Sequence, residues 1–296
     1  MNNVLTLIAA PQGLDESTVS HVEATFRGAG ATTGMLEWLA YRTAADLPFD
    51  GLPLEDAVDL AVESFEDAPI DAVAQPAEGR RKLLLVADME STIIENEMLD
   101  ELADEVGIRD QIADITARAM NGELDFAGAL RERVGLFAGL EVAALERAES
   151  RIRLMPGSAE LVATMRAHGA FCALVSGGFT YYTERIAQRL GFDFQQANQL
   201  EITDGALSGA VVEPILGRDA KRERLIALAK DRALPLEATM AVGDGANDLA
   251  MLEVAGMGIA YRAKPLVART ARARIDHADL TALLYIQGYR EEEFSR

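Results

Sequence analysis

The stretch Leu83-Leu84-Leu85-Val86-Ala87-Asp88-Met89-Glu90-Ser91-Thr92 decides the fold, because its apolar run ends abruptly in reactive polar residues. Two later apolar runs, 171–175 and 239–242, end in the same way, at Ser176-Gly177-Gly178 and at Gly243-Asp244-Gly245-Ala246-Asn247-Asp248. Short apolar runs without alternation are typical of strands buried on both faces of a parallel sheet. In such sheets, ligands bind beyond the carboxyl ends of the strands. We therefore expect the three ends to converge on one crevice suited to Mg²⁺ and phosphate.

Composition narrows the class of protein. A chain of 296 residues with 49% apolar content can form one large domain or two. The formal charge of -20 argues against nonspecific nucleic-acid binding and against a polybasic membrane anchor, since both need a basic face. One cysteine, Cys172, rules out an internal disulfide and favours a reducing compartment. The first residues lack the pattern of a signal peptide, and no run reaches the ~20 apolar residues of a membrane span. We expect a cytoplasmic protein.

A polar, breaker-rich segment at 75–81 predicts a linker, so we place a boundary between residues 1–77 and 78–296. The first part reads as a small α+β module that could be regulatory. Its order comes close to a βαββαβ fold with the third strand missing. The expected strands are 4–9, 35–41 and 70–73, and the expected helices are 17–28, with Ser17 as N-cap, and 54–65.

The second part changes from strand to helix after Asp88. Apolar residues recur at helical spacing in 96–106, 110–120 and 126–137, which predicts a helical cap over about 93–155 above the strand ends. Strand and helix then alternate, with helices at 180–190, 220–233 and 248–255 and short strands at 258–260 and 273–275. The predicted class is α/β, with a Rossmann-like parallel sheet core, a helical cap and the small N-terminal α+β module.

Two acids at the first strand end carry the chemistry. Asp88 is the candidate nucleophile, because a carboxylate that attacks phosphorus splits one hard displacement into two easier ones. Glu90 can point to the same side of the chain, where it could protonate the leaving alkoxide and then activate water. The alternative is an acidic pair that faces solvent.

The other strand ends supply metal and anion ligands. Asp244 and Asp248 in a glycine-flanked turn can reach one hard cation such as Mg²⁺, although an ordinary turn with Asp248 near a helix N-cap fits the same residues. Ser176-Gly177-Gly178 precedes a predicted helix, where backbone N–H groups and a hydroxyl favour an anion, or simply form an N-cap. Lys221 could neutralise phosphate or be a solvated helix residue.

Together these motifs resemble the haloacid dehalogenase superfamily from about Lys82 to the C-terminus. Asp88-Met89-Glu90-Ser91-Thr92 is similar to its first motif, Ser176 to its second, Lys221 to its third and 243–248 to its fourth. Within the superfamily the chain looks most like the phosphoserine phosphatases. The stretches that carry this likeness are Glu97-Met98-Leu99-Asp100-Glu101-Leu102, Met120-Asn121-Gly122-Glu123-Leu124-Asp125-Phe126, Leu130-Arg131-Glu132-Arg133-Val134 and Val175-Ser176-Gly177-Gly178-Phe179.

The resemblance implies a reaction: Mg²⁺-dependent hydrolysis of O-phosphoserine to serine and phosphate through an aspartyl-phosphate, the last step of serine biosynthesis. It also implies roles. Mg²⁺ would be held by Asp88, Asp244 and the backbone carbonyl of Glu90, with Asp248 in support. Phosphate would be held by Ser176, Gly177 and Lys221, with Asn247 nearby. Glu97 would contact the ammonium group of the substrate, and Arg133 would contact its carboxylate. Met120 and Phe126 would line the pocket under the cap. Without the resemblance, we would interpret Glu97 and Arg133 as solvated helix residues. We would interpret Met120 and Phe126 as residues that pack in the core of the cap.

One residue departs from the family pattern, since an aspartate usually stands where this chain has Glu90. The longer side chain must fold back to reach the same place, although a backbone carbonyl can bind metal whatever the side chain is. Other readings remain open: a related phosphotransferase, another small-molecule phosphatase, and a non-catalytic amino-acid sensor. The expected partner is a small-molecule substrate, not nucleic acid or membrane, and a homodimer is compatible with the sequence.

Overall fold

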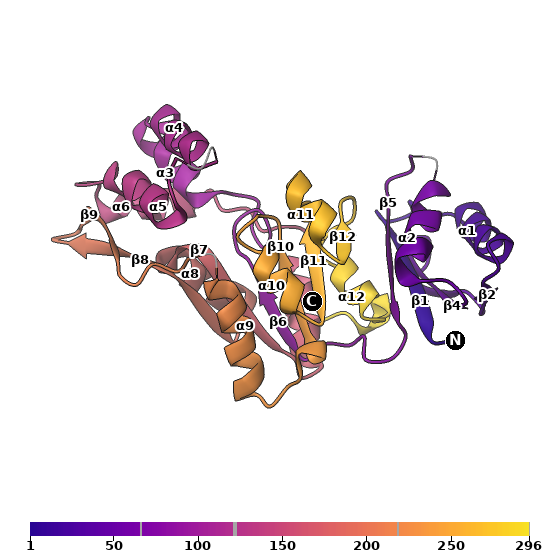
Figure 1. Cartoon of the computed structure of the whole chain (residues 1–296). Coiled ribbons are helices and arrows are strands. Elements are labelled where there is room, and N and C mark those ends of the chain that lie inside the picture. The colour runs from indigo at the N-terminus through magenta and orange to yellow at the C-terminus, as the bar shows by residue number, and fades with distance from the viewer. Residues whose placement is uncertain (66, 121–122, 218, 296) are drawn as a thin grey trace.

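The computed structural model describes residues 1–65, 67–120, 123–217 and 219–295, without the side chain of Met120. The chain forms two sheets, one of five strands built before residue 77 and one of seven strands built after it (Figure 1). The predicted class is confirmed, with a parallel α/β core and a small N-terminal module that has its own sheet. None of the described helices is long and apolar enough to cross a membrane.

The N-terminal module is an antiparallel sheet in the order β2-β4-β1-β5, with β3 paired to β4. Helices α1 and α2 share an apolar core with this sheet, in which Phe26 meets Phe49 edge to face. The elements are β1 (Asn3–Ala9), α1 (Glu16–Gly28), β2 (Thr32–Thr33), β3 (Glu37–Ala40), β4 (Ala44–Asp50), α2 (Leu54–Glu63) and β5 (Ile70–Pro76).

Three details of this module differ from the sequence prediction. The short strand β2 was not predicted. Asp15, not Ser17, caps α1, because its carboxylate accepts the Thr18 N–H at 2.7 Å while the Ser17 hydroxyl donates to Asp15. The missing strand is β4. Its buried Asp46 looks like a loop residue in the sequence, but it accepts a hydrogen bond from Thr6 at 2.7 Å and pairs with Arg80.

The seven-stranded sheet has the order β12-β11-β10-β6-β7-β8-β9 and is parallel except for the β8–β9 pair. Its strands are β6 (Leu84–Ala87), β7 (Phe171–Phe179), β8 (Phe194–Thr203), β9 (Ala206–Val212), β10 (Thr239–Gly243), β11 (Met257–Tyr261) and β12 (Ala273–Ile275). In β6, Leu84 and Val86 pack on one face and Leu85 and Ala87 on the other, so the strand is apolar throughout.

Helices cover both faces of this sheet. The helices of the core are α7 (Ser158–Ala167), α8 (Thr180–Leu190), α9 (Ala220–Asp231), α10 (Leu249–Val254), α11 (Pro265–Thr270) and α12 (Ala282–Ile286), with 3₁₀ turns η1 (Leu236–Ala238) and η2 (Glu291–Glu293). The predicted helices 180–190, 220–233 and 248–255 correspond to α8, α9 and α10 to within two residues. The hairpin β8–β9 was not predicted, and neither were the helices α7, α11 and α12.

The cap consists of α3 (Met98–Val106), α4 (Arg109–Met120), α5 (Phe126–Gly135) and α6 (Val142–Glu149), of which α6 was not predicted. It lies at the end of the molecule opposite to the N-terminal module (Figure 1). The β8–β9 hairpin supports the cap from below, because Leu207 exchanges backbone hydrogen bonds of 2.8 Å with Gly139 and Leu140.

The N-terminal module docks on the edge of the large sheet through β5. The Asp71 carboxylate accepts the backbone N–H groups of residues 276–278, just after β12. Gln75, which is 3% exposed, donates to the Ile286 carbonyl at 2.6 Å. The segment proposed as a linker therefore includes the end of β5 and contacts both parts of the chain.

Candidate active site

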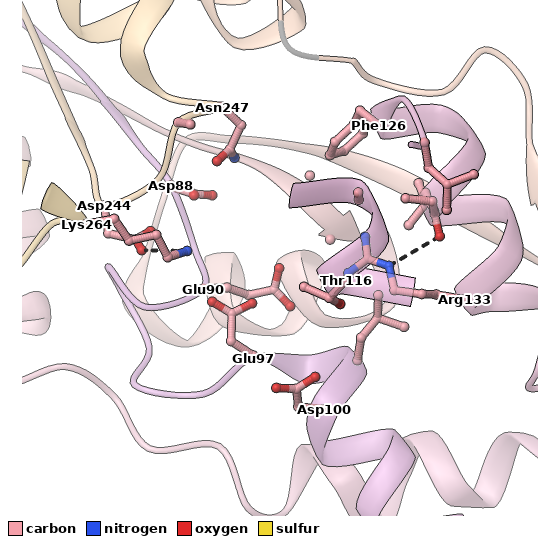
Figure 2. A pocket seen from close by; sticks show the side chains of 18 of the residues that line it. Asp88, Glu90, Glu97, Asp100, Thr116, Phe126, Arg133, Asp244, Asn247 and Lys264 are labelled. Atoms are coloured by element: carbon pink, nitrogen blue, oxygen red, sulfur yellow. Dashed lines mark hydrogen bonds and ion pairs between the residues drawn. The ribbon is translucent and has the colours of Figure 1, made fainter. Parts of the chain in front are cut away.

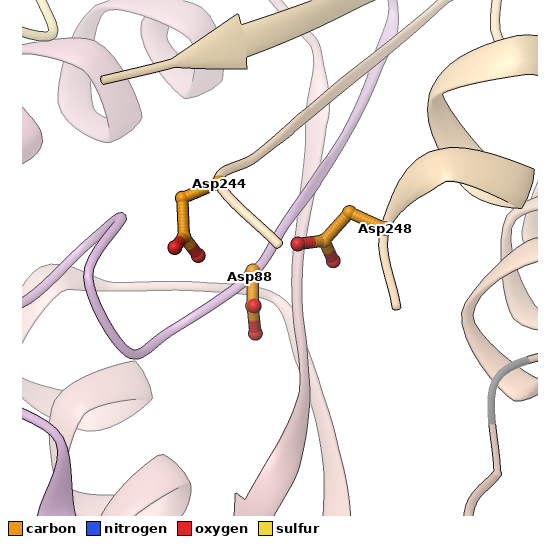
Figure 3. Close-up of side chains that lie close together, drawn as sticks. All are labelled: Asp88, Asp244 and Asp248. Atoms are coloured by element: carbon orange, nitrogen blue, oxygen red, sulfur yellow. The ribbon is translucent and has the colours of Figure 1, made fainter. Parts of the chain in front are cut away.

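The first and third strand ends bring acids to one point. Asp88 directly follows β6 and Asp244 directly follows β10, and these two strands are neighbours in the sheet. The Asp88 N–H donates to the Val242 carbonyl at 3.0 Å, which aligns the two ends. One carboxylate oxygen each from Asp88, Asp244 and Asp248 lies within 4.8 Å of the others (Figure 3).

A buried lysine joins two of these acids. Lys221, on the first turn of α9, places Nζ 2.7 Å from Oδ1 of Asp88 and 2.6 Å from Oδ1 of Asp248. Lys221 is 4% exposed and Asp248 0%, so neither is a solvated helix residue. Burial alone would lower the pKa of Lys221, but Asp248 and Asp88 raise it, so the lysine stays protonated.

Burial and the charge of Asp248 raise the pKa of the Asp88 carboxyl to about 7, although Lys221 opposes them. Asp88, Asp244 and Asp248 together can carry three negative charges, of which Lys221 balances one. The donors at this site are carboxylate oxygens, which suit a hard divalent cation better than a soft one. The donor set thus fits a divalent metal at Asp88 and Asp244.

Gly243 allows Asp248 to approach this closely. A Cβ on Gly243 would lie 2.3 Å from Cγ of Asp248, which no side chain could tolerate. Asp248 immediately precedes α10, as the alternative interpretation expected. Its carboxylate bonds to Lys221 and to the Gly245 N–H at 3.0 Å.

Glu90 connects the strand end to the cap. Its Oε1 accepts the backbone N–H of Met98, the first residue of α3, at 2.9 Å. Burial first, and then the charge of Glu97, raise the pKa of Glu90 to about 8. Glu90 is therefore an acid that keeps its proton at neutral pH, as a proton donor to a leaving group requires.

Gly178 provides the space that this longer side chain needs. A Cβ on Gly178 would lie 2.7 Å from Oε2 of Glu90. We expect Gly178→Ala to displace the Glu90 carboxylate and lower kcat roughly 10- to 100-fold, with little loss of thermal stability. The matched control is Gly28→Ala, where the added Cβ meets open space. Equal activity of the two variants would show that Gly178 does not hold Glu90 in place.

The second strand end differs from the expected helix N-terminus. Ser176, Gly177 and Gly178 belong to β7, and α8 begins only at Thr180. The Gly178 N–H donates to the Ser176 hydroxyl oxygen at 2.9 Å. Ser176 is buried, and a Cβ on Gly177 would lie 3.3 Å from the ring of Phe126 in the cap. The cap therefore closes down to the backbone of this strand end.

A cavity of about 680 Å³ lies between cap and core (Figure 2). Asp88, Asp244 and Asn247 stand at its core end, and Phe126 and Arg133 at its cap end, with Glu90 and Glu97 between them. Of the other predicted site residues, Ser176 and Lys221 line a small adjoining pocket with Asn247. The Met120 side chain lies outside the described residues.

Four further polar residues line the cavity and were not predicted as site residues: Asp100, Thr116, Asp125 and Lys264. Lys264 places Nζ 3.4 Å from Oδ2 of Asp244. Burial alone would lower the pKa of Lys264, but the charges of Asp244 and Glu97 raise it. Its sequence signal was weak, because Lys264-Pro265 reads only as a helix start.

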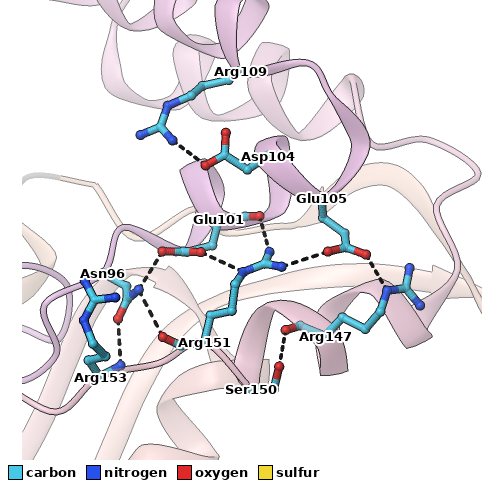
Figure 4. Close-up of polar contacts among 9 residues, drawn as sticks. All are labelled: Asn96, Glu101, Asp104, Glu105, Arg109, Arg147, Ser150, Arg151 and Arg153. Atoms are coloured by element: carbon cyan, nitrogen blue, oxygen red, sulfur yellow. Dashed lines mark hydrogen bonds and ion pairs between the residues drawn. The ribbon is translucent and has the colours of Figure 1, made fainter.

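The two segments that connect the core to the cap, around residues 94–96 and 151–154, contact each other (Figure 4). Ile94 pairs with Leu154 in an isolated bridge, and the Asn96 side chain accepts the Arg153 N–H at 2.8 Å. Arg151 then pairs with Glu101 at 2.9 Å and with Glu105, both on α3. The base of the cap is therefore held by a backbone bridge, a side-chain hydrogen bond and ion pairs.

Residues 85–253 match the family model of the haloacid dehalogenase-like hydrolases, which is more than half of the chain. A phosphoserine phosphatase of Streptomyces coelicolor is 39% identical over 252 residues, which are 80% of this chain and 62% of that protein. The chain thus spans about three fifths of the length of this relative, and similar shares of those from Mycobacterium tuberculosis and Archaeoglobus fulgidus.

Solved structures agree with this assignment. A HAD-family hydrolase of Salmonella enterica superposes on 98% of this chain and 99% of that one, with a TM-score of 0.85 and 30% identity. A substrate-bound phosphoserine phosphatase superposes on 69% of this chain and 98% of that one, with a TM-score of 0.65 and 39% identity. By its sequence, its sheet and the acids at its strand ends, the chain belongs to the haloacid dehalogenase-like hydrolase family.

Proposed function

We propose that this chain is a Mg²⁺-dependent phosphatase that hydrolyses O-phosphoserine to serine and phosphate. One observation carries the proposal: a single cavity has Asp88 and Asp244 at one end and Glu97 and Arg133 further along. The first end suits a phosphate and a cation. Further along the cavity, the carboxylate of Glu97 suits the ammonium of an amino acid, and the guanidinium of Arg133 suits its carboxylate.

Asp88 is the proposed nucleophile. Its carboxylate oxygen attacks phosphorus, the bond from phosphorus to the serine oxygen breaks, and an aspartyl-phosphate forms. Lys221, held between Asp88 and Asp248, supplies a fixed positive charge beside the reacting carboxylate. Asp88, Asp244 and the carbonyl of Glu90 would hold Mg²⁺, with Asp248 in support, and the ion would neutralise phosphate charge.

Glu90 performs the proton transfers in this proposal. It gives its proton to the departing serine oxygen in the first half-reaction. In the second half-reaction its carboxylate takes a proton from water, while the water oxygen attacks phosphorus and the bond to Asp88 breaks. The hydrogen bond from the Met98 N–H orients Glu90 for both steps only while α3 is in place.

Substrate selection falls to the cap. Arg133 Nε already donates to the Ala129 carbonyl at 3.3 Å, which leaves its terminal nitrogens to form a two-point contact with a carboxylate. Glu97 accepts the Ser91 hydroxyl at 2.7 Å and keeps its other oxygen for an ammonium. Phosphoserine phosphatases among the relatives support this choice of substrate.

The proposal is tested by phosphate release from a panel of phospho-amino acids and sugar phosphates, with Mg²⁺ and with EDTA. We expect O-phosphoserine to be the best substrate, with activity lost in EDTA and restored by Mg²⁺. An added alcohol acceptor shows whether phosphate is released or transferred. A preference for a sugar phosphate would refute the substrate assignment, and full activity in EDTA would refute the metal.

The rate should fall as pH rises well above neutral. Glu90 must carry a proton to protonate the leaving serine, and burial raises its pKa to about 8 in the metal-free protein, so this proton is lost on the alkaline side. The measurement is kcat as a function of pH for the Mg²⁺-loaded enzyme. A profile that stays flat to pH 10 would contradict Glu90 as the acid.

We further infer that the enzyme works in the cytoplasm at the end of serine biosynthesis. The one cysteine, Cys172, is buried in β7 and supports a protein that needs no oxidising compartment. A homodimer remains a prediction, which light scattering of the purified chain would check.

A further inference from the structure

The second lysine of the site, Lys264, is placed differently from Lys221. Lys221 is buried between two acids, but Lys264, which lines the cavity, has a side chain that is 66% exposed. Its Nζ nevertheless lies 3.4 Å from Oδ2 of Asp244. Lys221 is therefore held between two acids, whereas the Lys264 ammonium can move from Asp244 into water, where it is hydrated.

The backbone keeps Lys264 next to Asp244. The Lys264 N–H donates to the Asp244 carbonyl at 3.1 Å, and the Lys264 carbonyl accepts the Val267 N–H at 2.9 Å at the start of α11. The main chain of Lys264 is thus tied to the same residue that its side chain pairs with. The ammonium can swing away, but it cannot drift far from the Asp244 carboxylate.

The composition of the chain makes this lysine notable. The sequence has only four lysines, Lys82, Lys221, Lys230 and Lys264, and otherwise uses arginine for positive charge. Two of the four face the acids of the site. Lysine differs from arginine in carrying a compact charge on a flexible stem, without a planar fork that would lock onto a carboxylate. A charge that must give way to a metal ion is better supplied by lysine.

We propose that Lys264 is a displaceable counter-cation of Asp244 that sets how tightly the resting site binds its divalent metal. The inference rests on the proposed function, because it presumes a metal at Asp88 and Asp244. In metal-free protein the ammonium partly balances the acids and holds the Asp244 carboxylate in place. When the metal binds, this ammonium is released from Asp244, and its positive charge opposes the incoming cation.

The first experiment measures Mn²⁺ binding to EDTA-stripped protein by electron paramagnetic resonance, without substrate. We expect Lys264→Gln to bind Mn²⁺ on the order of ten-fold more tightly than the unchanged chain, since a nearby positive charge is gone. Lys264→Arg, which keeps the charge, should bind no more tightly than the unchanged chain. Lys230→Gln on the exposed side of α9 removes the same charge far from the acids and is the control.

The outcomes separate the two proposals. If the unchanged chain binds no Mn²⁺, the proposed metal-dependent function fails. If the unchanged chain binds Mn²⁺ and Lys264→Gln binds it equally or more weakly, the proposed function stands and the role of Lys264 is overturned. Should Lys264→Gln not fold, Lys264→Met keeps the aliphatic stem and gives the same comparison.

A second readout distinguishes this role from simple structural support. In EDTA we expect Lys264→Gln to melt at a lower temperature than the unchanged chain, because its acids lose a counter-charge. With saturating Mn²⁺ the difference should close, since the bound ion replaces that charge and stabilises the folded state. An equal loss of melting temperature with and without Mn²⁺ would mean that Lys264 only supports the fold, and would overturn the proposal.

Discussion

Replacing Asp88 by asparagine is expected to lower phosphate release from O-phosphoserine by about 10⁴-fold or more, because a carboxamide cannot form the aspartyl-phosphate. The substitution keeps the shape of the side chain. Asparagine can still accept the hydrogen bond from Lys221, which at present donates to Oδ1 of Asp88. The loss should therefore appear in kcat, measured with saturating Mg²⁺ and substrate.

The fold should tolerate this change. The pKa of Asp88 is raised to about 7 by burial and by Asp248, so its negative charge is costly at neutral pH and above. A neutral asparagine removes that cost, and we expect a melting temperature in EDTA at least equal to that of the unchanged chain. Asp59→Asn on the exposed face of α2 is the control for activity. A phosphorylated intermediate trapped on Asp88→Asn would refute the role of Asp88.

Replacing Glu90 by glutamine should lower kcat by roughly 10²- to 10³-fold, because general acid–base catalysis contributes on that scale. Mg²⁺ binding should persist, since the proposed ligand from this residue is its backbone carbonyl. Glutamine can still accept the Met98 N–H through its carbonyl oxygen, so the link to α3 survives. The measurements are kcat by phosphate release and Mn²⁺ affinity by paramagnetic resonance.

The control for this second variant is Glu90→Asp, which restores the acid that the family usually carries. We expect it to retain more activity than Glu90→Gln but less than the unchanged chain, because the shorter side chain falls short of the Met98 N–H and leaves the space at Gly178 unfilled. Near-normal turnover of Glu90→Gln would remove Glu90 from the mechanism.

The strand ends of the site were predictable because of the rules of parallel sheets. Buried strands such as β6 and β10 are apolar on both faces, and their carboxyl ends share an edge, so Asp88 and Asp244 had to approach one another. Helical periodicity likewise located α3, α4 and α5 of the cap. These features depend on the spacing of apolar residues along the chain and on one rule, that the carboxyl ends of parallel strands lie at the same edge of the sheet.

The missed features depend on contacts between distant residues. The strand β4 is hidden by Asp46, whose burial is explained only by Thr6 and Arg80. The hairpin β8–β9 has polar residues along its length, because it leaves the core to support the cap. Gly178 and Lys264 lack a signal of their own, since each acts through a partner elsewhere in the sequence, at Glu90 and at Asp244.

In the proposed reaction, Asp88 carries the phosphoryl group during hydrolysis of O-phosphoserine. The most direct test quenches the Mg²⁺-loaded enzyme during turnover, reduces acyl phosphates with borohydride and maps the peptides by mass spectrometry. We expect homoserine at position 88, dependent on O-phosphoserine and absent when substrate is omitted. Reduction or phosphorylation at another residue, with position 88 still aspartate in an enzyme that is turning over, would contradict it.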